Sequence, residues 1–430
     1  MEKLPTLRAG DASPATDLLQ TALSRSGFRT AVDGIFGSKT LSAVRGFQAT
    51  RGLVQDGVVG YNTWKSLSPY LAGFMLREVA PGDTYYKLAA EYGTKPRAIE
   101  TANPGIDPER LTVGTELVIP LPFDVTPVNI RWSAAALAIC AEGIGARYPF
   151  VAWRTYGRSV TGHELLCAEI GAGYGHEVFY NASHHANEWI TTPVLVKFLE
   201  DYAKAVSAGG EMYGIDAQSL FGKSRLTVAP LVNPDGVELV TGALRSGAYY
   251  DKARAIAAEF PGIPFPDGWK ANIEGVDPNL QYPANWNRAR EIKFAQGFTK
   301  PAPRDFVGDA PLTAPESRAV RDLTLAHDFK LTLSYHTQGE VIYWKYLDME
   351  PPLSRELAEL FGRISGYTPE LTPPDSSFAG YKDWFIEMYD RPGFTIECGL
   401  GAPPLQPDKF GKIYLENFGV LATALTANIL

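Results

Sequence analysis

Cysteine is scarce in this chain, with three residues among 430: Cys140, Cys167 and Cys398. They are far apart, odd in number and each surrounded by apolar residues. A disulfide framework needs paired cysteines, and a cysteine-based metal site needs closer spacing, so we expect neither. Three buried free thiols are the simpler expectation.

Long apolar runs and basic runs are also missing. No stretch of roughly eighteen apolar residues is present, so we expect no membrane span. The N-terminal segment lacks the apolar core of a signal peptide, which predicts synthesis in the cytoplasm unless a leader has been lost. The net charge is −8 and no Lys/Arg run occurs, which argues against a nucleic-acid partner.

The length and composition that remain are those of a soluble protein of two or three domains. Residues 5–70 carry a repeated Asp-Gly turn, at Asp33-Gly34 and again at Asp56-Gly57, between helical patterns. This arrangement predicts a small three-helix bundle in which Ser38 and Asn62 cap helices.

The same segment resembles the peptidoglycan-binding domain of wall hydrolases, which implies a wall-binding role. Most of the matching residues are structural, so the resemblance is more specific for the fold than for the ligand. The match is carried by Leu19-Gln20, Val32–Gly37, Phe47-Gln48, Asp56-Gly57 and Thr63-Trp64.

Residues 75–122 form a second small unit. Asp83 or Thr84 is placed to cap a helix that Gly93 closes, a second helix follows, and residues 113–120 read as a return strand. This β-α-α-β pattern resembles the LysM module, which binds glycans containing N-acetylglucosamine; a spacer role is the alternative. The prolines that follow predict a stiff linker.

Residues 128–430 alternate between strand-like and helical runs, which predicts an α/β sandwich with a mostly parallel or mixed sheet. Its last helix is expected over residues 415–430. We expect the chemistry of the chain to lie in this third segment, at the points where strands end.

Two candidate metal ligands, His185 and Glu188, lie three residues apart in a strand-to-helix loop. An imidazole and a carboxylate so placed can reach one Zn²⁺, although the pair alone is also explained as a surface ion contact. A distant third ligand is required, and His336 ends an apolar strand. His327 lies in a helical segment, and His184 is out of register with Glu188.

Glu397 lies inside a strand that is otherwise apolar. Glutamate is rarely buried without a partner, because burial disfavours its charged form. Burial would raise its pKa towards the working pH, as a general base requires; a structural salt bridge is the alternative.

Together these segments resemble the zinc carboxypeptidase family, which has the fold of the pancreatic carboxypeptidases. The resemblance implies one Zn²⁺ per chain, held by His185, Glu188 and His336, with Glu397 as the base that activates water. It also implies that Asp277, within the string Gly275-Val-Asp-Pro-Asn279, orients His185.

Two departures from the family pattern concern the substrate. In the family this string ends with Asn-Arg, and the Arg binds the terminal carboxylate of the substrate. At the corresponding positions this chain has Asn279-Leu280. Lys270 stands where the family has an oxyanion-stabilising Arg. Its ammonium supplies a point charge in place of the bidentate donors of a guanidinium. The mobile substrate-binding Tyr of the family has no clear counterpart, and Tyr381 is the nearest candidate.

These departures resemble a branch of the family, the γ-D-glutamyl-L-diamino acid endopeptidases of spore-forming bacteria. The strings His336–Trp344, which includes Glu340, and Gly380–Phe385 carry that likeness. The branch implies cleavage of the γ-D-glutamyl bond to meso-diaminopimelate or lysine in peptidoglycan stem peptides, at the cell wall or spore cortex. Asn279, Leu280, Tyr381 and Glu340 are then the candidates for substrate contacts.

Two other functions fit the sequence less well. A conventional carboxypeptidase would need another cation, such as Arg288 or Arg290, in place of the missing Arg. A non-catalytic wall-binding protein is opposed by the retained metal and base residues. The sequence does not decide between diaminopimelate and lysine, and it gives no oligomeric state.

Overall fold

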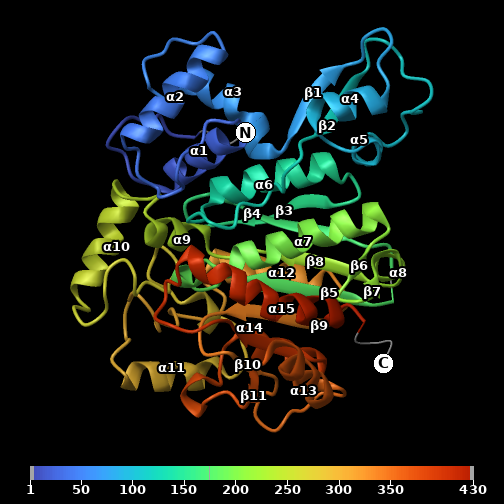
Figure 1. Cartoon of the computed structure of the whole chain (residues 1–430). Helices are drawn as coiled ribbons and strands as arrows, with labels where there is room; N and C mark the ends of the chain where they lie inside the picture. The colour runs from blue at the N-terminus through green and yellow to red at the C-terminus, as the bar shows by residue number, and fades with distance from the viewer. Residues whose placement is uncertain (1–3, 174, 427–430) are drawn as a thin grey trace. The chain divides into compact units, whose positions relative to one another are not determined.

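The computed structural model of the chain describes residues 4–173 and 175–426 and separates into two units (Figure 1). The first unit comprises Met1–Arg131, Ala135–Trp153 and Glu200–Gly210, and the second comprises the remainder. The units therefore do not coincide with the segments expected at 5–70, 75–122 and 128–430, whose boundaries stay a prediction.

The N-terminal part of the first unit has three helices packed through their apolar faces. Leu19, Val44 and Phe47 are fully buried there. Gly37 and Gly60 precede the second and third helices, so the prediction that Ser38 and Asn62 act as caps was wrong; both lie inside the first helical turn. The helices are α1 (Pro14–Arg25), α2 (Ser38–Thr50) and α3 (Tyr61–Ala72).

A buried glutamine closes each of the two repeated turns. Gln20 Nε2 donates to Asp33 Oδ1 at 2.7 Å, and Gln20 Oε1 accepts from Gly34 N at 2.8 Å. Gln48 repeats this one helix later: its Nε2 donates to an Asp carboxylate at 3.1 Å and its Oε1 accepts from Gly57 N at 3.0 Å. Both glycines have positive φ, which explains the Asp-Gly signature.

The next part of the first unit has the expected β-α-α-β order. Thr84 caps its first helix by accepting from Lys87 N, and Gly93 ends that helix in a left-handed conformation, as predicted. Leu88, Ile99 and Leu117 form its core. The elements are β1 (Phe74–Glu78), α4 (Tyr85–Tyr92), α5 (Pro96–Ala102) and β2 (Glu116–Pro120), with β1 and β2 antiparallel; α6 (Ala134–Arg147) follows.

A mixed sheet of eight strands organises the second unit, in the order β11-β10-β12-β9-β5-β8-β4-β3. The neighbours β12, β9, β5 and β8 are parallel, while β10 and β4 run antiparallel to β12 and β8. This confirms the predicted mixed α/β sheet. The strands are β3 (Ala152–Arg158), β4 (Glu164–Ile170), β5 (Glu177–Ala182), β8 (Arg225–Ala229), β9 (Phe329–His336), β10 (Val341–Tyr343), β11 (Thr368–Glu370) and β12 (Gly393–Glu397).

Helices cover both faces of this sheet. Because alternate residues of β5 point to opposite faces, neighbouring residues of this strand contact the two different helical layers. Phe179 packs against Tyr381 of one helical layer, while the Tyr180 hydroxyl donates to Leu421 O of the other. The helices are α7 (Thr191–Ala208), α8 (Ala217–Lys223), α9 (Pro234–Thr241), α10 (Ala248–Ala258), α11 (Trp286–Ala295), α12 (Pro315–Leu325), α13 (Ser354–Ser365), α14 (Tyr381–Tyr389) and α15 (Phe410–Ala424); β6 (Glu211–Met212) and β7 (Ile215–Asp216) form a small hairpin.

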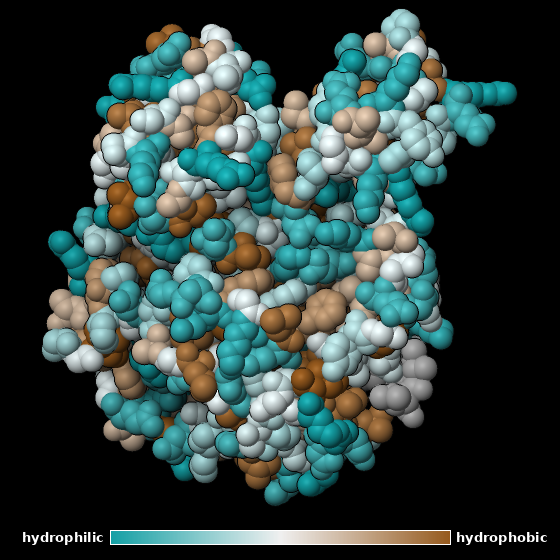
Figure 2. All heavy atoms as spheres, viewed as in Figure 1, coloured by the Kyte–Doolittle hydropathy of each residue, from teal (hydrophilic) through white to brown (hydrophobic). Residues whose placement is uncertain are grey.

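All three cysteines are free and buried, as predicted. The last helix begins earlier than expected, and residues 427–430 lie outside the described part of the chain. Within residues 4–173 and 175–426, no helix combines the length and apolarity needed to cross a membrane. Figure 2 shows hydrophilic side chains intermixed with scattered apolar ones on the visible face.

The buried glutamines give a test of the repeat. Gln48→Met removes the acceptor of Gly57 N and the donor to the turn carboxylate, at a cost of about 1–3 kcal/mol for a stranded buried group. We expect faster hydrogen exchange in residues 50–64 of the full chain, read by mass spectrometry. Ser42→Ala, at an exposed position of the same helix, should leave exchange there unchanged; equal protection in both variants would contradict the role of Gln48.

Candidate active site

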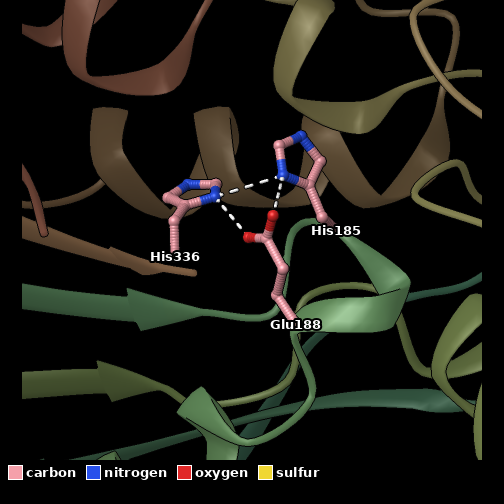
Figure 3. A group of neighbouring side chains, drawn as sticks. All are labelled: His185, Glu188 and His336. Atoms are coloured by element: carbon pink, nitrogen blue, oxygen red, sulfur yellow. Dashed lines mark hydrogen bonds and ion pairs between the residues drawn. The ribbon is translucent and has the colours of Figure 1, made fainter. Parts of the chain in front are cut away.

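Two imidazoles and a carboxylate converge at the carboxyl edge of the parallel strands (Figure 3). His185 follows β5, Glu188 ends the short turn η1 (Ala186–Glu188), and His336 is the last residue of β9. Glu188 Oε1 lies 3.0 Å from His185 Nδ1, and Glu188 Oε2 lies 2.8 Å from His336 Nδ1. The two Nδ1 atoms are 3.2 Å apart.

This donor set fits a zinc ion. One ligand atom from each of His185, Glu188 and His336 lies within 4.8 Å of the other two. Three lone-pair donors aimed at one point repel one another unless a cation lies between them, and two imidazoles with one carboxylate are a frequent ligand set of catalytic zinc. The structure thus brings together the three predicted ligands, while His327 lies apart, beside Glu177.

Asp277, which the family resemblance implies as the partner of His185, lies beside the outer nitrogen of that ring. Its Oδ1 atom is 3.3 Å from His185 Nε2 and accepts from Asn279 N, and its Oδ2 accepts from Asp305 N. Burial opposes ionisation of Asp277, but the adjacent His185 and the Asp305 amide hold its pKa well below the usual range. A carboxylate on the outer ring nitrogen fixes the imidazole so that Nδ1 faces inward.

Glu397 ends β12 and is paired in register with His336 of β9. It lines the same pocket as both histidines. Burial raises the pKa of Glu397, against the opposing effect of His336. A raised pKa is the direction that a general base working near neutral pH requires.

Lys270 reaches the metal ligands from a different loop. Its Nζ lies 2.8 Å from Glu188 Oε1, and its carbonyl accepts from Ala186 N, which holds the η1 turn. Burial lowers the pKa of Lys270, but Glu188 raises it by more, so the side chain stays charged. The structure therefore places a fixed positive charge in the pocket beside the ligand set.

Asn279 and Leu280, two of the candidates for substrate contacts, line the pocket. Asn279 Oδ1 accepts from Tyr381 N at 3.1 Å and so anchors the start of α14. Leu280 packs against the apolar cluster of Trp286 and Val307. The position where the family has an Arg is therefore an apolar wall.

The other two candidates for substrate contacts, Tyr381 and Glu340, stay predictions, although Tyr381 is among the residues that line the pocket. Tyr381 has a fully buried side chain in the core, where its hydroxyl lies 3.0 Å from Thr324 Oγ1 and its ring packs against Phe179. Glu340 forms an ion pair with Lys412 and is not among the residues that line the pocket.

Neither cation considered for a conventional carboxypeptidase lines the pocket. Arg288 pairs with Glu291 at 2.8 Å, and the Arg290 guanidinium lies 4.2 Å from the centre of the Phe294 ring. The missing family Arg is therefore not replaced by either of them.

Several charged residues of the pocket were not predicted. Asp305 pairs with Lys293 at 2.7 Å and with Arg304 at 2.5 Å, beside Asp277. Lys382 and Asp383 line the pocket from the first turn of α14. No periodicity marks Lys293, Arg304 or Asp305 in the sequence, because they come from a helix and a loop that the fold alone brings to the site.

A fully buried carboxylate supports the loop that carries Lys270 and Asp277. Glu316 Oε2 accepts from Asn272 Nδ2 at 3.1 Å, and Asn272 Oδ1 accepts from Val276 N. Burial raises the pKa of Glu316 to about 7, although the Asn272 hydrogen bond lowers it. The loop therefore depends on a group whose charge changes near neutral pH.

Comparisons with known proteins give three family matches. Residues 140–378 match the zinc carboxypeptidase family, residues 13–67 a putative peptidoglycan binding domain, and residues 78–120 the LysM domain.

Two relatives are similar over about two thirds of this chain. Gamma-D-glutamyl-L-diamino acid endopeptidase 1 of Lysinibacillus sphaericus is 43% identical over 278 residues, which cover 65% of this chain and 68% of the relative. The uncharacterized protein YqgT of Bacillus subtilis (strain 168) is 40% identical over 282 residues, 65% of this chain and 73% of that protein.

Solved structures agree on the fold. Bovine thrombin-activatable fibrinolysis inhibitor, in complex with tick carboxypeptidase inhibitor, aligns with a TM-score of 0.52 at 17% identity, over 70% of this chain and 98% of that one. Carboxypeptidase A from Helicoverpa armigera also gives 0.52, at 16% identity over 80% and 79% of the two chains. At these identities the likeness shows the carboxypeptidase-like fold alone.

Glu316 predicts a pH-dependent stability. Below pH ~4.5 the carboxyl is protonated in both the folded and the unfolded chain. As pH rises towards 7 only the unfolded chain ionises, so the folded state loses up to about 3 kcal/mol, in full above pH 7. Glu316→Gln cannot ionise, so calorimetry should show its melting temperature rising relative to wild type between pH 5 and pH 8.

Glu359→Gln, at an exposed position of α13, is the control and should show no such pH dependence. A difference between wild type and Glu316→Gln that is the same at both pH values would contradict the assignment.

Proposed function

The chain belongs to the zinc carboxypeptidase family, and from that membership we propose that it hydrolyses the bond between γ-D-glutamate and a diamino acid in peptidoglycan stem peptides. It is a zinc metallopeptidase with a carboxypeptidase-like α/β fold. The observation that supports this choice of bond is Leu280, which lines the pocket at the position where the family has its carboxylate-binding Arg.

We assign one role each to the ligand set, to Glu397 and to Lys270. His185, Glu188 and His336 would hold the zinc ion, which when bound would supply Lewis acidity to the scissile carbonyl. Glu397 takes a proton from the attacking water and returns it to the leaving amine. Lys270 stabilises the developing oxyanion with its charge.

The remaining polar contacts of the site position these groups. Asp277 fixes the ring of His185. Asn279 holds the first turn of α14 at the pocket by accepting from Tyr381 N. The site is therefore organised by a chain of hydrogen bonds that runs from the ligand set to α14.

An apolar wall at Leu280 disfavours ordinary carboxypeptidase activity. A substrate that ends in an α-carboxylate needs a buried cation beside that group, because an unpaired buried charge costs several kcal/mol. Arg304 and Lys293 line the pocket, but Asp305 already neutralises part of their charge. A peptide whose recognition does not depend on a terminal carboxylate fits this pocket better.

The matches to a peptidoglycan binding domain and a LysM domain support the same substrate. Two weak wall-binding modules on one chain raise the effective concentration of the peptidase at the polymer. The relative that is 43% identical carries the corresponding activity in its name. Action at the cell wall, or at the cortex of a spore, is part of this proposal.

The bond is identified by its products. Wild-type protein should convert L-Ala-γ-D-Glu-meso-diaminopimelyl-D-Ala to L-Ala-D-Glu and diaminopimelyl-D-Ala, read by mass spectrometry, and should act weakly on hippuryl-Phe. Glu397→Gln should lower the rate by ~10²–10⁴-fold while keeping its zinc, because only the proton-transfer group is lost. Ready hydrolysis of hippuryl-Phe with the γ-D-glutamyl bond intact would indicate a conventional carboxypeptidase.

The metal ligands are tested by zinc content. His336→Ala removes one of three ligands, so elemental analysis should show less than one zinc per chain and a parallel loss of activity. His327→Ala, which removes a histidine outside the cluster, should keep full zinc. Full occupancy in the His336→Ala protein would exclude His336 as a ligand.

A further inference from the structure

Arg304 lines the pocket with a guanidinium that the protein uses only in part. Its side chain is 41% exposed, and its Nε atom donates to Asp305 Oδ2 at 2.5 Å. No described residue accepts a hydrogen bond from either of its Nη atoms. The end of the guanidinium that carries the two Nη atoms is therefore available to a ligand.

The cluster around Arg304 has one positive charge in excess. Asp305 is shared by two cations: Lys293 Nζ lies 2.7 Å from its Oδ1, and Arg304 Nε contacts its Oδ2. The neighbouring carboxylate of Asp277 is already paired with His185. Burial lowers the pKa of Arg304, but Asp305 raises it by more, so the guanidinium stays charged. One excess charge with unused donors matches one carboxylate.

Hydrogen bonds of the two residues that flank Arg304 fix its place in the pocket. Pro303 O accepts from Lys270 N at 2.8 Å, and Asp305 N donates to Asp277 Oδ2 at 3.2 Å. Asp305 has a φ of 64°, a left-handed conformation that residues other than glycine seldom adopt. The backbone thus holds Arg304 beside the loop of Lys270.

Lys270 and Glu397 act on different sides of the scissile bond in the proposed mechanism. Glu397 returns a proton to the leaving amine, whereas Lys270 stabilises the oxygen of the acyl group. Because Arg304 is held beside the Lys270 loop, the acyl residue is the part of the substrate expected next to it.

A γ-linked glutamyl residue carries the anion that such a site binds. Its scissile carbonyl belongs to the side chain, so its α-carboxylate stays free and charged. Four carbon–carbon bonds of about 1.5 Å separate the two carboxyl carbons, which lie roughly 5 Å apart when the residue is extended. In an α-linked peptide the α-carbonyl is itself the scissile group, and no backbone carboxylate remains on the acyl residue.

We propose that Arg304 binds the α-carboxylate of the γ-D-glutamyl residue and so selects γ-linked substrates. The inference rests on the proposed function and names a specificity-determining residue for it. The two Nη atoms offer parallel donors to the two carboxylate oxygens. Asp305 orients the guanidinium through Nε, and Lys293 offsets the charge of Asp305, which leaves the charge of Arg304 for the substrate.

Three peptides that differ only at the glutamyl α-carbon test this assignment. They are L-Ala-X-meso-diaminopimelyl-D-Ala, in which X is γ-D-glutamyl, its α-carboxamide γ-D-isoglutaminyl, or 4-aminobutyryl, which has neither group. Wild-type kcat/KM should be about tenfold or more higher for the carboxylate than for the other two. Because salt screens a partly exposed ion pair, this preference should shrink in about 0.5 M salt.

Two variants of Arg304 separate charge from geometry. Arg304→Gln removes the charge, so the carboxylate-to-amide ratio should fall to about one. Arg304→Lys keeps the charge without the parallel donors, so its ratio should lie between those of wild type and Arg304→Gln. A defect that is merely structural lowers the rates on all peptides together and leaves their ratio unchanged.

Arg288→Gln is the matched control. Arg288 also pairs with a nearby carboxylate, that of Glu291 at 2.8 Å, but it does not line the pocket. This variant should keep the wild-type ratio. Zinc content and melting temperature show which variants are folded; if neither Arg304 variant folds, the wild-type order of the peptides and its salt dependence decide alone.

A fourth peptide, the γ-D-glutamyl peptide with its terminal D-Ala amidated, tests the other carboxylate of the substrate. The proposal is supported if Arg304→Gln abolishes the preference for the glutamyl carboxylate and leaves the ratio of free to amidated terminus unchanged. It is overturned if only the terminal ratio changes, because Arg304 then binds the terminal carboxylate. Persistence of the glutamyl preference in Arg304→Gln overturns it as well.

The wild-type rates distinguish this inference from the proposed function. Equal wild-type rates on the three α-carbon peptides overturn the role of Arg304 and leave the cleaved bond as proposed. Failure of the wild type to cut any of the γ-linked peptides overturns the proposed function and this inference together.

Discussion

Glu188 is a carboxylate with almost no exposure, and the site is built around the need to compensate its charge. His185, His336 and Lys270 each lie within 3.0 Å of one of its two oxygens. Desolvation opposes the ionised form, yet these neighbours hold the pKa of Glu188 well below its usual value. The arrangement is stable only as a set, because removing one partner of a buried charge leaves the others uncompensated.

The need to compensate the Glu188 charge explains why segments far apart in the sequence meet at this site. His185 and Glu188 follow β5, His336 ends β9 and Glu397 ends β12, so the parallel sheet itself aligns them at one edge. Lys270 comes from a loop with no regular structure. That loop is held by Asn272 and the buried Glu316, so helix α12 supports the site although none of its residues lines the pocket.

The first unit depends on polar burial in a different way. Gln20 and Gln48 are buried amides that satisfy the backbone of a following Asp-Gly turn. A repeated turn held by a repeated side chain is a solution within one small segment, because the glutamine lies 14 residues before the turn amide in the first copy and nine in the second. This is why the Asp-Gly signals could be recognised in the sequence, while the caps expected from Ser38 and Asn62 could not be distinguished from ordinary first-turn residues.

The sequence alone determined the features that rest on local patterns. Strand ends marked by His336 and Glu397, the His185 and Glu188 spacing, and the alternation of strands and helices were enough to predict the mixed sheet and the residues that meet at its edge. Sequence position does not say which way a side chain points: the Tyr381 side chain lies in the core, and Glu340 pairs with Lys412. Only the tertiary structure brought Arg304, Lys293 and the Lys382–Asp383 pair to the pocket. Their roles depend on burial and on neighbours remote in the chain, and both are set by packing and not by any local pattern.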